Sequence, residues 1–366
     1  MPLKASLHKR TFEFSFNART SRGAMKEKIS WFIKIWDDHA SEIVGIGECG
    51  PLPGLSPEYT PEFESTLESL ISDINNKFIA LPSLSDLAEL NASLENLIGK
   101  EGISTYSSFV FALETALLDL MNGGNKIIFR NQFIEGHPIP INGLIWMGGL
   151  DFMLQQIELK IRDGFTCLKL KVGSHDFEKE CDVLQYIRRK YFRDKITIRL
   201  DANGAFRKDD ALTKLKELSR FEIQSIEQPI KPGLEEMATL CRESPIPIAL
   251  DEELIGVNGL SARHDLLARI KPQFIILKPT LHGGLVSCAE WISICEGLGI
   301  GWWVTSALES SIGLNSIAQF TGNYPVQIPQ GLGTGMIYSN NIESPLTVNK
   351  GQLTYQKGLI WSQIDD

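Results

Sequence analysis

Three acidic side chains recur at the ends of short apolar runs in the second half of the chain. Asp201, Glu227 and Asp251 lie roughly 25 residues apart, about the length of one strand, one helix and their loops. One carboxylate in such a position is often a helix N-cap, but three that converge would repel one another unless a cation joined them. Carboxylate oxygens suit a hard divalent ion, so the spacing predicts a Mg²⁺ site at which Mn²⁺ could substitute. None of the six histidines lies at these positions, which argues against zinc.

Three lysines accompany these acids in equally apolar contexts. Lys169 and Lys171 are two residues apart in Cys-Leu-Lys-Leu-Lys-Val, so their side chains point to the same side of a strand. Lys278 ends the run Phe-Ile-Ile-Leu-Lys-Pro. Lysine is rarely buried without a partner, and a lysine beside a metal ion and a second lysine should have a lowered pKa, as a general base requires. The alternative is that these lysines are solvated or only neutralise the acids.

Such residues need a scaffold that brings the ends of several strands together. Short β-branched runs alternate with amphipathic segments from about residue 138 onward. Eight strands are expected, at Ile139–Ile145, Cys167–Val172, Ile196–Ala202, Ser225–Ile230, Ile246–Glu252, Phe274–Pro279, Gly301–Ser306 and Val326–Gln330. Helices are expected at Phe152–Arg162, Phe177–Tyr191, Lys208–Ser219, Leu234–Arg242, Gly259–Ala268 and Leu285–Glu296. This alternation predicts a parallel sheet that closes into an α/β barrel of the TIM type, with its chemistry at the C-terminal rim.

The N-terminal part has a different pattern. Strand signals dominate to about residue 50, with alternation at Phe12–Phe16 and a β-branched and aromatic run at Trp31–Trp36. Gly45–Ser56 is so rich in glycine and proline that we expect a loop there. Helices are expected near residues 61–78, 84–99 and 107–122.

These patterns divide the chain into three parts. We expect an α+β domain over residues 1–122 and the barrel over residues 123–338. The pattern breaks near residue 340, so residues 339–366 form a tail that returns to the first domain and contributes a strand at Leu353–Tyr355.

Composition narrows the functional class. A formal net charge of −9, with 22% charged residues, argues against nucleic acid as a partner. No apolar run approaches the roughly 20 residues of a membrane span, and the N-terminus does not resemble a signal peptide. The six cysteines form no C-x-x-C pair and are expected to be reduced, partly buried thiols. We therefore expect a cytoplasmic protein that acts on a small molecule, and leave a homo-oligomer open.

The motif resembles that of the enolase superfamily, muconate-lactonizing enzyme subgroup. That subgroup carries K-x-K on the second barrel strand, acids on the third, fourth and fifth, and a lysine on the sixth. Lys169-Leu170-Lys171, Asp201, Glu227, Asp251 and Lys278 fill every position. The resemblance implies a modified (β/α)₇β barrel, with an N-terminal α+β capping domain completed by the C-terminal tail. It also implies a Mg²⁺-dependent enzyme with an enediolate mechanism.

Within the subgroup the chain is most similar to the o-succinylbenzoate synthase family of menaquinone biosynthesis. The loop from Gly47 to Ser56 resembles the one that closes over substrate in that family, which implies roles for Gly50 and Leu52. Ser306–Gly313 and Gln330–Gly335 resemble stretches whose backbone receives the succinyl carboxylate, which implies roles for Ser306 and Gly331. We also assign Asn203 and Arg199 to the substrate site, although Arg199 could equally be a packing residue of the barrel interior.

The resemblance implies a hydro-lyase reaction, the syn dehydration of 2-succinyl-6-hydroxy-2,4-cyclohexadiene-1-carboxylate. Lys171 would remove the α-proton, Lys278 would stabilise the enediolate from the other face, and Lys169 would orient Lys171. The same lysine pair would serve an N-acylamino acid racemase, a dipeptide epimerase or a muconate-type cycloisomerase. Dipeptide epimerases commonly carry an Asp-x-Asp pair near the end of strand eight, where this chain has Gln330–Gly333. A non-catalytic metal-binding protein would have no need for both lysines.

Overall fold

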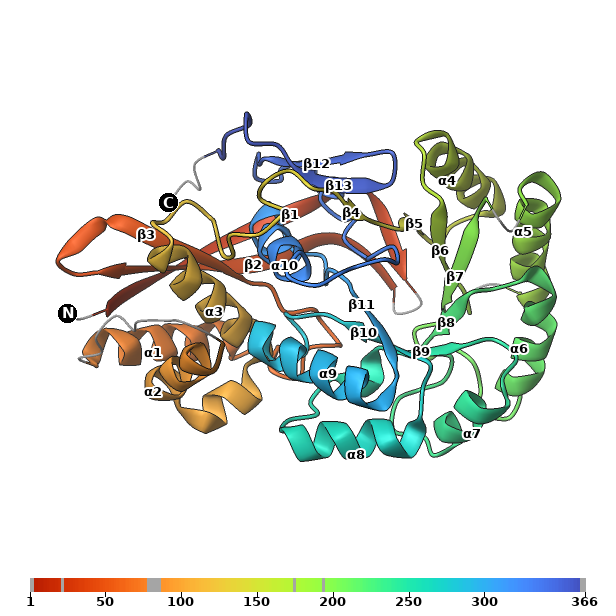
Figure 1. Ribbon diagram of the computed structural model, residues 1–366, viewed down its shortest axis with the longest axis horizontal. Helices are drawn as coiled ribbons and strands as arrows, with labels where there is room; N and C mark the ends of the chain where they lie inside the picture. The colour runs from red at the N-terminus through yellow and green to blue at the C-terminus, as the bar shows by residue number, and fades with distance from the viewer. Residues whose placement is uncertain (1–2, 21–22, 78–86, 174–175, 193–194, 363–366) are drawn as a thin grey trace.

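The computed structural model describes residues 3–20, 23–77, 87–173, 176–192 and 195–362. An antiparallel sheet with three helices forms one part, and a curled parallel sheet ringed by helices forms the other (Figure 1). This architecture confirms the predicted α/β class with an N-terminal α+β unit. No helix of the described residues is both long and apolar enough to span a membrane.

The N-terminal part begins with a three-stranded antiparallel sheet. Its strands are β1 (Leu3–Thr20), β2 (Gly23–Asp37) and β3 (Ala40–Cys49), in that order across the sheet. The predicted runs of Phe12–Phe16 and Trp31–Trp36 lie in β1 and β2, and the buried side chains of β2 join the apolar core below the sheet.

Three helices cover this sheet: α1 (Phe63–Asn76), α2 (Leu87–Thr105) and α3 (Ser107–Met121). They confirm the predicted helices, whose expected ends at residues 78 and 84–86 lie outside the described residues. Helix α2 is interrupted at Gly99, where φ is 74°, so the predicted end at residue 99 falls at this break and a second helical segment continues to Thr105.

The prediction of a loop from Gly45 was wrong for the first five residues, because Gly45–Cys49 belong to β3. Glycine serves here for close packing rather than for a turn. A Cβ at Gly45 would lie 2.0 Å from the carbonyl oxygen of Ala116, and one at Gly47 would lie 1.9 Å from that of Ala112. Strand β3 can therefore lie directly on α3, and the loop begins at Gly50.

The parallel sheet carries the predicted strand order around the barrel. Its strands run β11-β10-β9-β8-β7-β6-β5, which is a single consecutive series. Their bounds are β5 (Gly143–Ile145), β6 (Cys167–Lys171), β7 (Thr197–Asp201), β8 (Ser225–Glu227), β9 (Ile248–Leu250), β10 (Phe274–Leu277) and β11 (Gly301–Val304). The eighth position differs from the prediction of a strand at Val326–Gln330.

Only Gln330 and Gly331 bridge to the neighbouring strands at the eighth position. The Gln330 amide donates to the Pro140 carbonyl and the Gly331 amide to the Val304 carbonyl, each at 2.8 Å. Pro329 lacks an amide donor, so the chain before Gln330 cannot form a regular ladder. Two residues thus close the barrel.

Helices ring the sheet on its outer side (Figure 1). Those predicted appear as α4 (Leu150–Arg162), α5 (Phe177–Lys190), α6 (Ala211–Leu218), α7 (Glu236–Glu243), α8 (Leu260–Ile270) and α9 (Gly284–Leu298). Short 3₁₀ turns follow α6 at Ser219–Phe221 and β9 at Glu252–Leu254. Helix α10 (Ser311–Thr321) was not predicted.

The tail contacts both parts of the molecule. Its strands β12 (Leu346–Asn349) and β13 (Gln352–Tyr355) form a small antiparallel sheet with β4 (Ile139–Pro140), at the start of the barrel. Just before them, Ser339 donates its amide to the Glu13 carbonyl of β1 at 2.9 Å. The domain boundaries at residues 122 and 338 remain a prediction.

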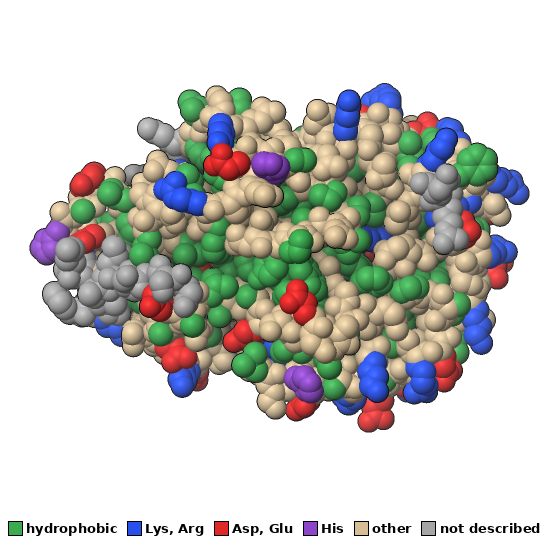
Figure 2. Space-filling model, in the orientation of Figure 1, with side chains coloured by type: hydrophobic (Ala, Val, Ile, Leu, Met, Phe, Trp, Pro, Cys, Tyr) green, Lys and Arg blue, Asp and Glu red, His purple; other side chains and the backbone are tan. Residues whose placement is uncertain are grey.

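The six cysteines are free and buried, as expected. In the face shown in Figure 2, hydrophobic side chains gather across the middle of the molecule, and most charged side chains lie toward the edge.

Candidate active site

The strand register brings the predicted acids and lysines to one height on the barrel rim. Lys171 pairs with Asp201 across β6 and β7, and Asp201 pairs with Glu227 across β7 and β8. Asp251 directly follows β9, and Lys278 directly follows β10. The short parallel strands therefore place all five side chains at the C-terminal end of the sheet.

Lysines link the three acids into one buried network. Lys169 Nζ lies 2.9 Å from Asp201 Oδ2 and also pairs with Glu227. Lys278 pairs with Asp251, and its Nζ lies 3.6 Å from Glu227 Oε1. Glu227 is thus shared between the two lysines, which connect it to Asp201 on one side and to Asp251 on the other.

Lys171 contacts Asp201 within this network and also lines the cavity above it. Its Nζ lies 2.6 Å from Asp201 Oδ2 and donates to Asn203 Oδ1 at 2.8 Å. Asn203 in turn donates through Nδ2 to Glu252 Oε1 at 3.0 Å. These contacts fix both the ammonium group and the amide beside it.

Charge and burial act against each other at these groups. Burial alone would raise the pKa of Asp201, but Lys169 and Lys171 hold it well below its usual range. Burial raises the pKa of Asp251 well above the ordinary value, although Lys278 opposes that shift.

Lys169 and Lys278 show the reverse balance. Burial disfavours their charged forms, yet Asp201 and Glu227 raise the pKa of Lys169, and Asp251 raises that of Lys278. The acids around these two lysines therefore outweigh burial. The expectation of lowered lysine pKa values concerns the site with its cation bound, and stays a prediction.

The acids provide oxygen atoms that suit a hard cation. Asp251 Oδ1 is buried without a hydrogen-bond partner among the described residues, and the buried oxygens of Glu227 contact the ammonium groups of Lys169 and Lys278 there. No three acids of the described part are grouped as a ready ligand set, since Lys169 and Lys278 lie between them. The donor chemistry therefore fits Mg²⁺, provided that the two ammonium groups yield the shared oxygens.

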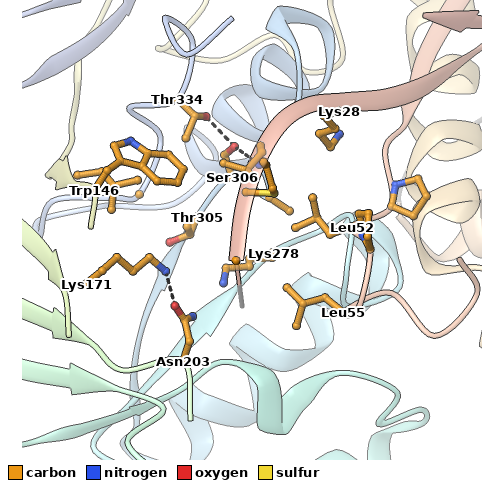
Figure 3. Close-up of a pocket in the computed structure, with 18 of the residues that line it drawn as sticks. Lys28, Leu52, Leu55, Trp146, Lys171, Asn203, Lys278, Thr305, Ser306 and Thr334 are labelled. Atoms are coloured by element: carbon orange, nitrogen blue, oxygen red, sulfur yellow. Dashed lines mark hydrogen bonds between the residues drawn. The ribbon is translucent and has the colours of Figure 1, made fainter. Parts of the chain in front are cut away.

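A cavity of about 440 Å³ opens above the lysines. Figure 3 shows Lys171 and Lys278 entering it from different strands, with Trp146, Leu52 and Leu55 around them. The lining comes from the β1–β2 hairpin, the loop after β3 and the barrel rim: Gly23, Ala24, Met25, Glu27, Lys28, Ile29, Pro51, Leu52, Pro53, Leu55, Tyr59, Asn142, Leu144, Trp146, Lys169, Lys171, Asn203, Lys278, Thr305, Ser306, Ala307, Leu308, Gly331, Gly333 and Thr334.

Most residues predicted for substrate binding line this cavity. Leu52, Asn203, Ser306 and Gly331 all do so, as do the three lysines. The Ser306 hydroxyl accepts a hydrogen bond from Thr334 Oγ1 at 2.7 Å, which ties the loops after β11 and the eighth position together.

Two predicted residues lie elsewhere. Arg199 is buried inside the barrel, where it donates to Gln224 Oε1 at 2.9 Å and to the Pro329 carbonyl at 2.7 Å. Its guanidinium also stacks 4.1 Å from the ring centroid of Trp303. These contacts favour the packing alternative for Arg199. Gly50 is absent from the lining, and its Cα faces Lys28 instead.

Sequence reasoning missed several lining residues. Lys28 lies on the buried face of β2 with Ser30 and Phe32, and this alternation was a usable signal. No sequence pattern predicted that Thr305 and Asn142 would line the cavity, where Thr305 Oγ1 and Asn142 Oδ1 offer polar atoms. Both atoms are buried without a hydrogen-bond partner among the described residues, so they are available to a ligand.

Comparison with known proteins agrees with this geometry. Residues 153–359 match the family described as "Enolase C-terminal domain-like". An o-succinylbenzoate synthase from Desulfotalea psychrophila is 44% identical over 356 residues, which cover 93% of this chain and 95% of that protein. The o-succinylbenzoate synthase of Haemophilus influenzae is 27% identical over 79% of this chain and 78% of its own length.

Solved structures give the same result for the fold. The crystal structure of MenC from Desulfotalea psychrophila has a TM-score of 0.87 at 39% identity, and covers 97% of this chain and 100% of that one. The L-Ala-D/L-Glu epimerase of Bacillus subtilis has a TM-score of 0.81 at 19% identity, over 97% of this chain and 96% of its own. The latter likeness concerns the fold alone.

Proposed function

Because the chain belongs to the o-succinylbenzoate synthase family of enolase-like proteins, we propose that it dehydrates 2-succinyl-6-hydroxy-2,4-cyclohexadiene-1-carboxylate to o-succinylbenzoate, a step of menaquinone biosynthesis. The charge of the cavity is the observation that carries this proposal. Four lysines line it, and Glu27 is the single acid among its described lining residues. A substrate with two carboxylates suits such a site, whereas a cationic substrate does not.

We assign proton transfer to Lys171. Its Nζ would take the α-proton from the ring carbon that bears the carboxylate, and the electron pair of that C–H bond would move toward the carboxylate. The C–O bond of the ring hydroxyl then breaks, and the Lys171 ammonium returns the proton, so that water leaves and the ring becomes aromatic. One base suffices because both groups leave from the same face.

The other two lysines have supporting roles in this proposal. Lys278 approaches the cavity from β10 and would place its positive charge over the opposite face of the ring as negative charge develops. Lys169 lies deeper, between Asp201 and Glu227, and would hold the Asp201 carboxylate in place for Lys171.

Asp201, Glu227 and Asp251 would hold the metal ion. When bound, Mg²⁺ would bind the ring carboxylate and draw onto it the charge that develops as the proton leaves. Asp201 also contacts Lys171 Nζ at 2.6 Å, so this carboxylate would lie between the cation and the proposed base.

The alternative activities of this scaffold use the same lysine pair. A racemase needs one base on each face, which Lys171 and Lys278 could supply. A dipeptide epimerase needs an acid for the substrate ammonium, and the region that carries it in those enzymes offers none here. Gln330 is buried and bonded to the Val304 amide and the Ile328 carbonyl, each at 2.8 Å.

A direct assay tests the proposal. The Mg²⁺-loaded protein should convert the cyclohexadiene carboxylate to an aromatic product, followed by ultraviolet absorbance. A panel of N-succinylamino acids and dipeptides should be turned over far more slowly, as measured by polarimetry or proton exchange. Faster turnover of that panel would refute the assignment and leave only the family.

A further inference from the structure

The cavity contains a fourth lysine that the proposed mechanism does not use. Lys28 of β2 lines the cavity, yet its side chain is only 3% exposed. Figure 3 shows it on the far side of the cavity from Lys171. The cavity therefore has a cationic end in the barrel and a second one in the N-terminal sheet.

Lys28 has fewer partners than a buried ammonium group needs. Its Nζ donates to Ser30 Oγ at 3.1 Å, and the carboxylate of Glu48 is 3.9 Å away. Ser30 is its sole hydrogen-bond acceptor among the described residues, although an ammonium group carries three donors. A buried charge with unmet donors is unfavourable, so an acceptor from the cavity would stabilise it.

Glu48 is occupied by other donors and cannot supply that acceptor. Its Oε1 accepts from Ser30 Oγ at 2.8 Å and from the Ser310 amide at 2.9 Å. Its Oε2 accepts from Ser310 Oγ at 2.5 Å and from the Gly313 amide at 3.0 Å. Glu48 therefore caps the N-terminus of helix α10, where the amides of the first turn stabilise its negative charge.

Glu309 is the other acid near Lys28. It accepts from Thr280 Oγ1 at 2.5 Å and from the Ala307 amide at 2.7 Å. Burial raises its pKa toward the neutral acid, although Lys28 acts in the opposite direction. Neither acid thus directs a free oxygen at the Lys28 ammonium.

The loop after β3 leaves room for this ammonium group. A Cβ at Gly50 would lie 2.3 Å from Lys28 Nζ, which is closer than any real contact. The φ of Gly50 is not in the left-handed region, so a side chain at this position would conflict with the present place of the Lys28 ammonium group and not with the backbone conformation. The loop residues Leu52 and Leu55 line the cavity beside it and provide an apolar wall.

We propose that Lys28 adds a charged side chain to the backbone groups near Ser306 and Gly331 that the family resemblance assigns to the succinyl carboxylate, and so selects substrates with two carboxylates. This inference rests on the proposed function, because the ring carboxylate takes the metal end of the cavity. The methylene groups of the chain would then cross the apolar wall of Leu52 and Leu55. Lys28 is a specificity-determining residue in this scheme, and takes no part in proton transfer.

Binding of two matched ligands tests the role of Lys28. Calorimetry on the Mg²⁺-loaded protein would compare o-succinylbenzoate with 2-butanoylbenzoate, in which a methyl group replaces the terminal carboxylate. Lys28→Met should weaken the binding of o-succinylbenzoate by about 10- to 100-fold, the usual loss for a hydrogen-bonded charge. The affinity for 2-butanoylbenzoate should stay unchanged. Lys28→Arg keeps the positive charge and should retain part of the preference for o-succinylbenzoate over 2-butanoylbenzoate. Lys26→Met, an exposed lysine of the same strand outside the cavity lining, is the control.

Gly50→Ala gives an independent route, since its Cβ would displace the ammonium group and should cause the same selective loss. If Lys28→Met weakens the binding of both ligands equally, Lys28 only supports the fold. If it changes the binding of neither, other groups hold the chain carboxylate. Either result overturns the proposal. The proposed function is tested by a different measurement. If it is wrong, the wild-type protein does not turn over the cyclohexadiene carboxylate, whatever affinities the two ligands show.

Discussion

Each charged residue at the barrel rim depends on a neighbour of opposite charge. Lys169 contacts Asp201 and Glu227, and Lys278 contacts Glu227 and Asp251. Removing one partner of a buried ion pair commonly costs about 3–5 kcal/mol, so a variant at this site can lose stability as well as chemistry. Tests of individual residues therefore require a measurement of folding beside the rate.

Lys171→Ala should remove the base and leave the fold intact, because Asp201 keeps its ion pair with Lys169 at 2.9 Å. We expect dehydration to fall by about 10²- to 10⁴-fold, the usual contribution of a positioned general base. Product absorbance measures the rate, and circular dichroism checks the fold. Lys179→Ala, on the exposed face of α5, should have no effect. Activity retained in Lys171→Ala would assign the base to another group.

Asp251→Asn keeps the shape of a metal ligand and removes its charge. We expect Mg²⁺ affinity, measured by calorimetry, to fall by more than about 100-fold, and turnover to be lost with it. The wild-type protein should lose activity in a chelator and regain it with excess Mg²⁺. Full activity of Asp251→Asn, or of the wild type in excess chelator, would exclude the predicted site.

Lys278→Arg separates dehydration from racemisation. Arginine keeps a positive charge near the ring but stays protonated, so it cannot act as a base. We expect partial retention of o-succinylbenzoate synthesis, and complete loss of any α-proton exchange that would need Lys278 as a base. Exchange of N-succinylamino acids in deuterium oxide, followed by NMR, provides the measurement. Complete loss of o-succinylbenzoate synthesis in Lys278→Arg would show that dehydration needs more from Lys278 than its positive charge.

At the level of elements, strand β3 and the loop after it join the two parts of the molecule. Gly45 and Gly47 bring β3 onto α3, and Glu48 accepts hydrogen bonds from the start of α10. Gly50 then leaves space for Lys28. Within a few residues, glycines allow close packing, Glu48 caps a helix and Gly50 leaves space at the cavity. Neighbouring residues can have different roles because alternate side chains of a strand point to opposite faces.

Gly47→Ala should destabilise the protein without touching the cavity. Its Cβ would lie 1.9 Å from the Ala112 carbonyl, so β3 or α3 must shift, at a cost of roughly 1–3 kcal/mol. Urea unfolding measures the change. Gly297→Ala in α9 meets no atom within 4 Å and should stabilise by about 0.5–1 kcal/mol. An unchanged unfolding midpoint for Gly47→Ala would contradict the close packing of β3 on α3.

At the level of the whole molecule, local patterns predicted the barrel strands and the residues at their ends. Asp201, Glu227 and Lys278 could be found because apolar strands and the acids or lysines that end them are adjacent in sequence. Helix α10 was missed because all of its residues are buried, so it has no amphipathic period. The alternation of Lys28 with Ser30 and Phe32 indicates a buried face of β2, but its place at the cavity depends on how β2 packs over the barrel, which no short-range pattern encodes.

Glu114 connects the N-terminal part to the barrel in the same manner as Glu48. It is buried in α3 and accepts hydrogen bonds from the amides of Leu285 and Val286, at the start of α9. Glu114→Ala would leave two buried amides without acceptors, and should lower the free energy of unfolding by roughly 2–4 kcal/mol. Urea unfolding near pH 5 measures this loss. Glu296→Ala, an exposed acid of α9, should have little effect.

The pH dependence of that loss tests the charge state of Glu114. Burial raises its pKa to about 8 from the ordinary value of 4.5. The folded protein then holds a proton that the unfolded chain releases, so this stabilising contribution is complete below about pH 4.5 and is lost as the pH rises to about 8. The difference in free energy of unfolding between wild type and Glu114→Ala should therefore narrow over this range. Other titrating groups are common to both proteins, so their contributions cancel in this difference. A gap that stays constant or widens would mean that the amides of α9 keep Glu114 ionised despite its burial.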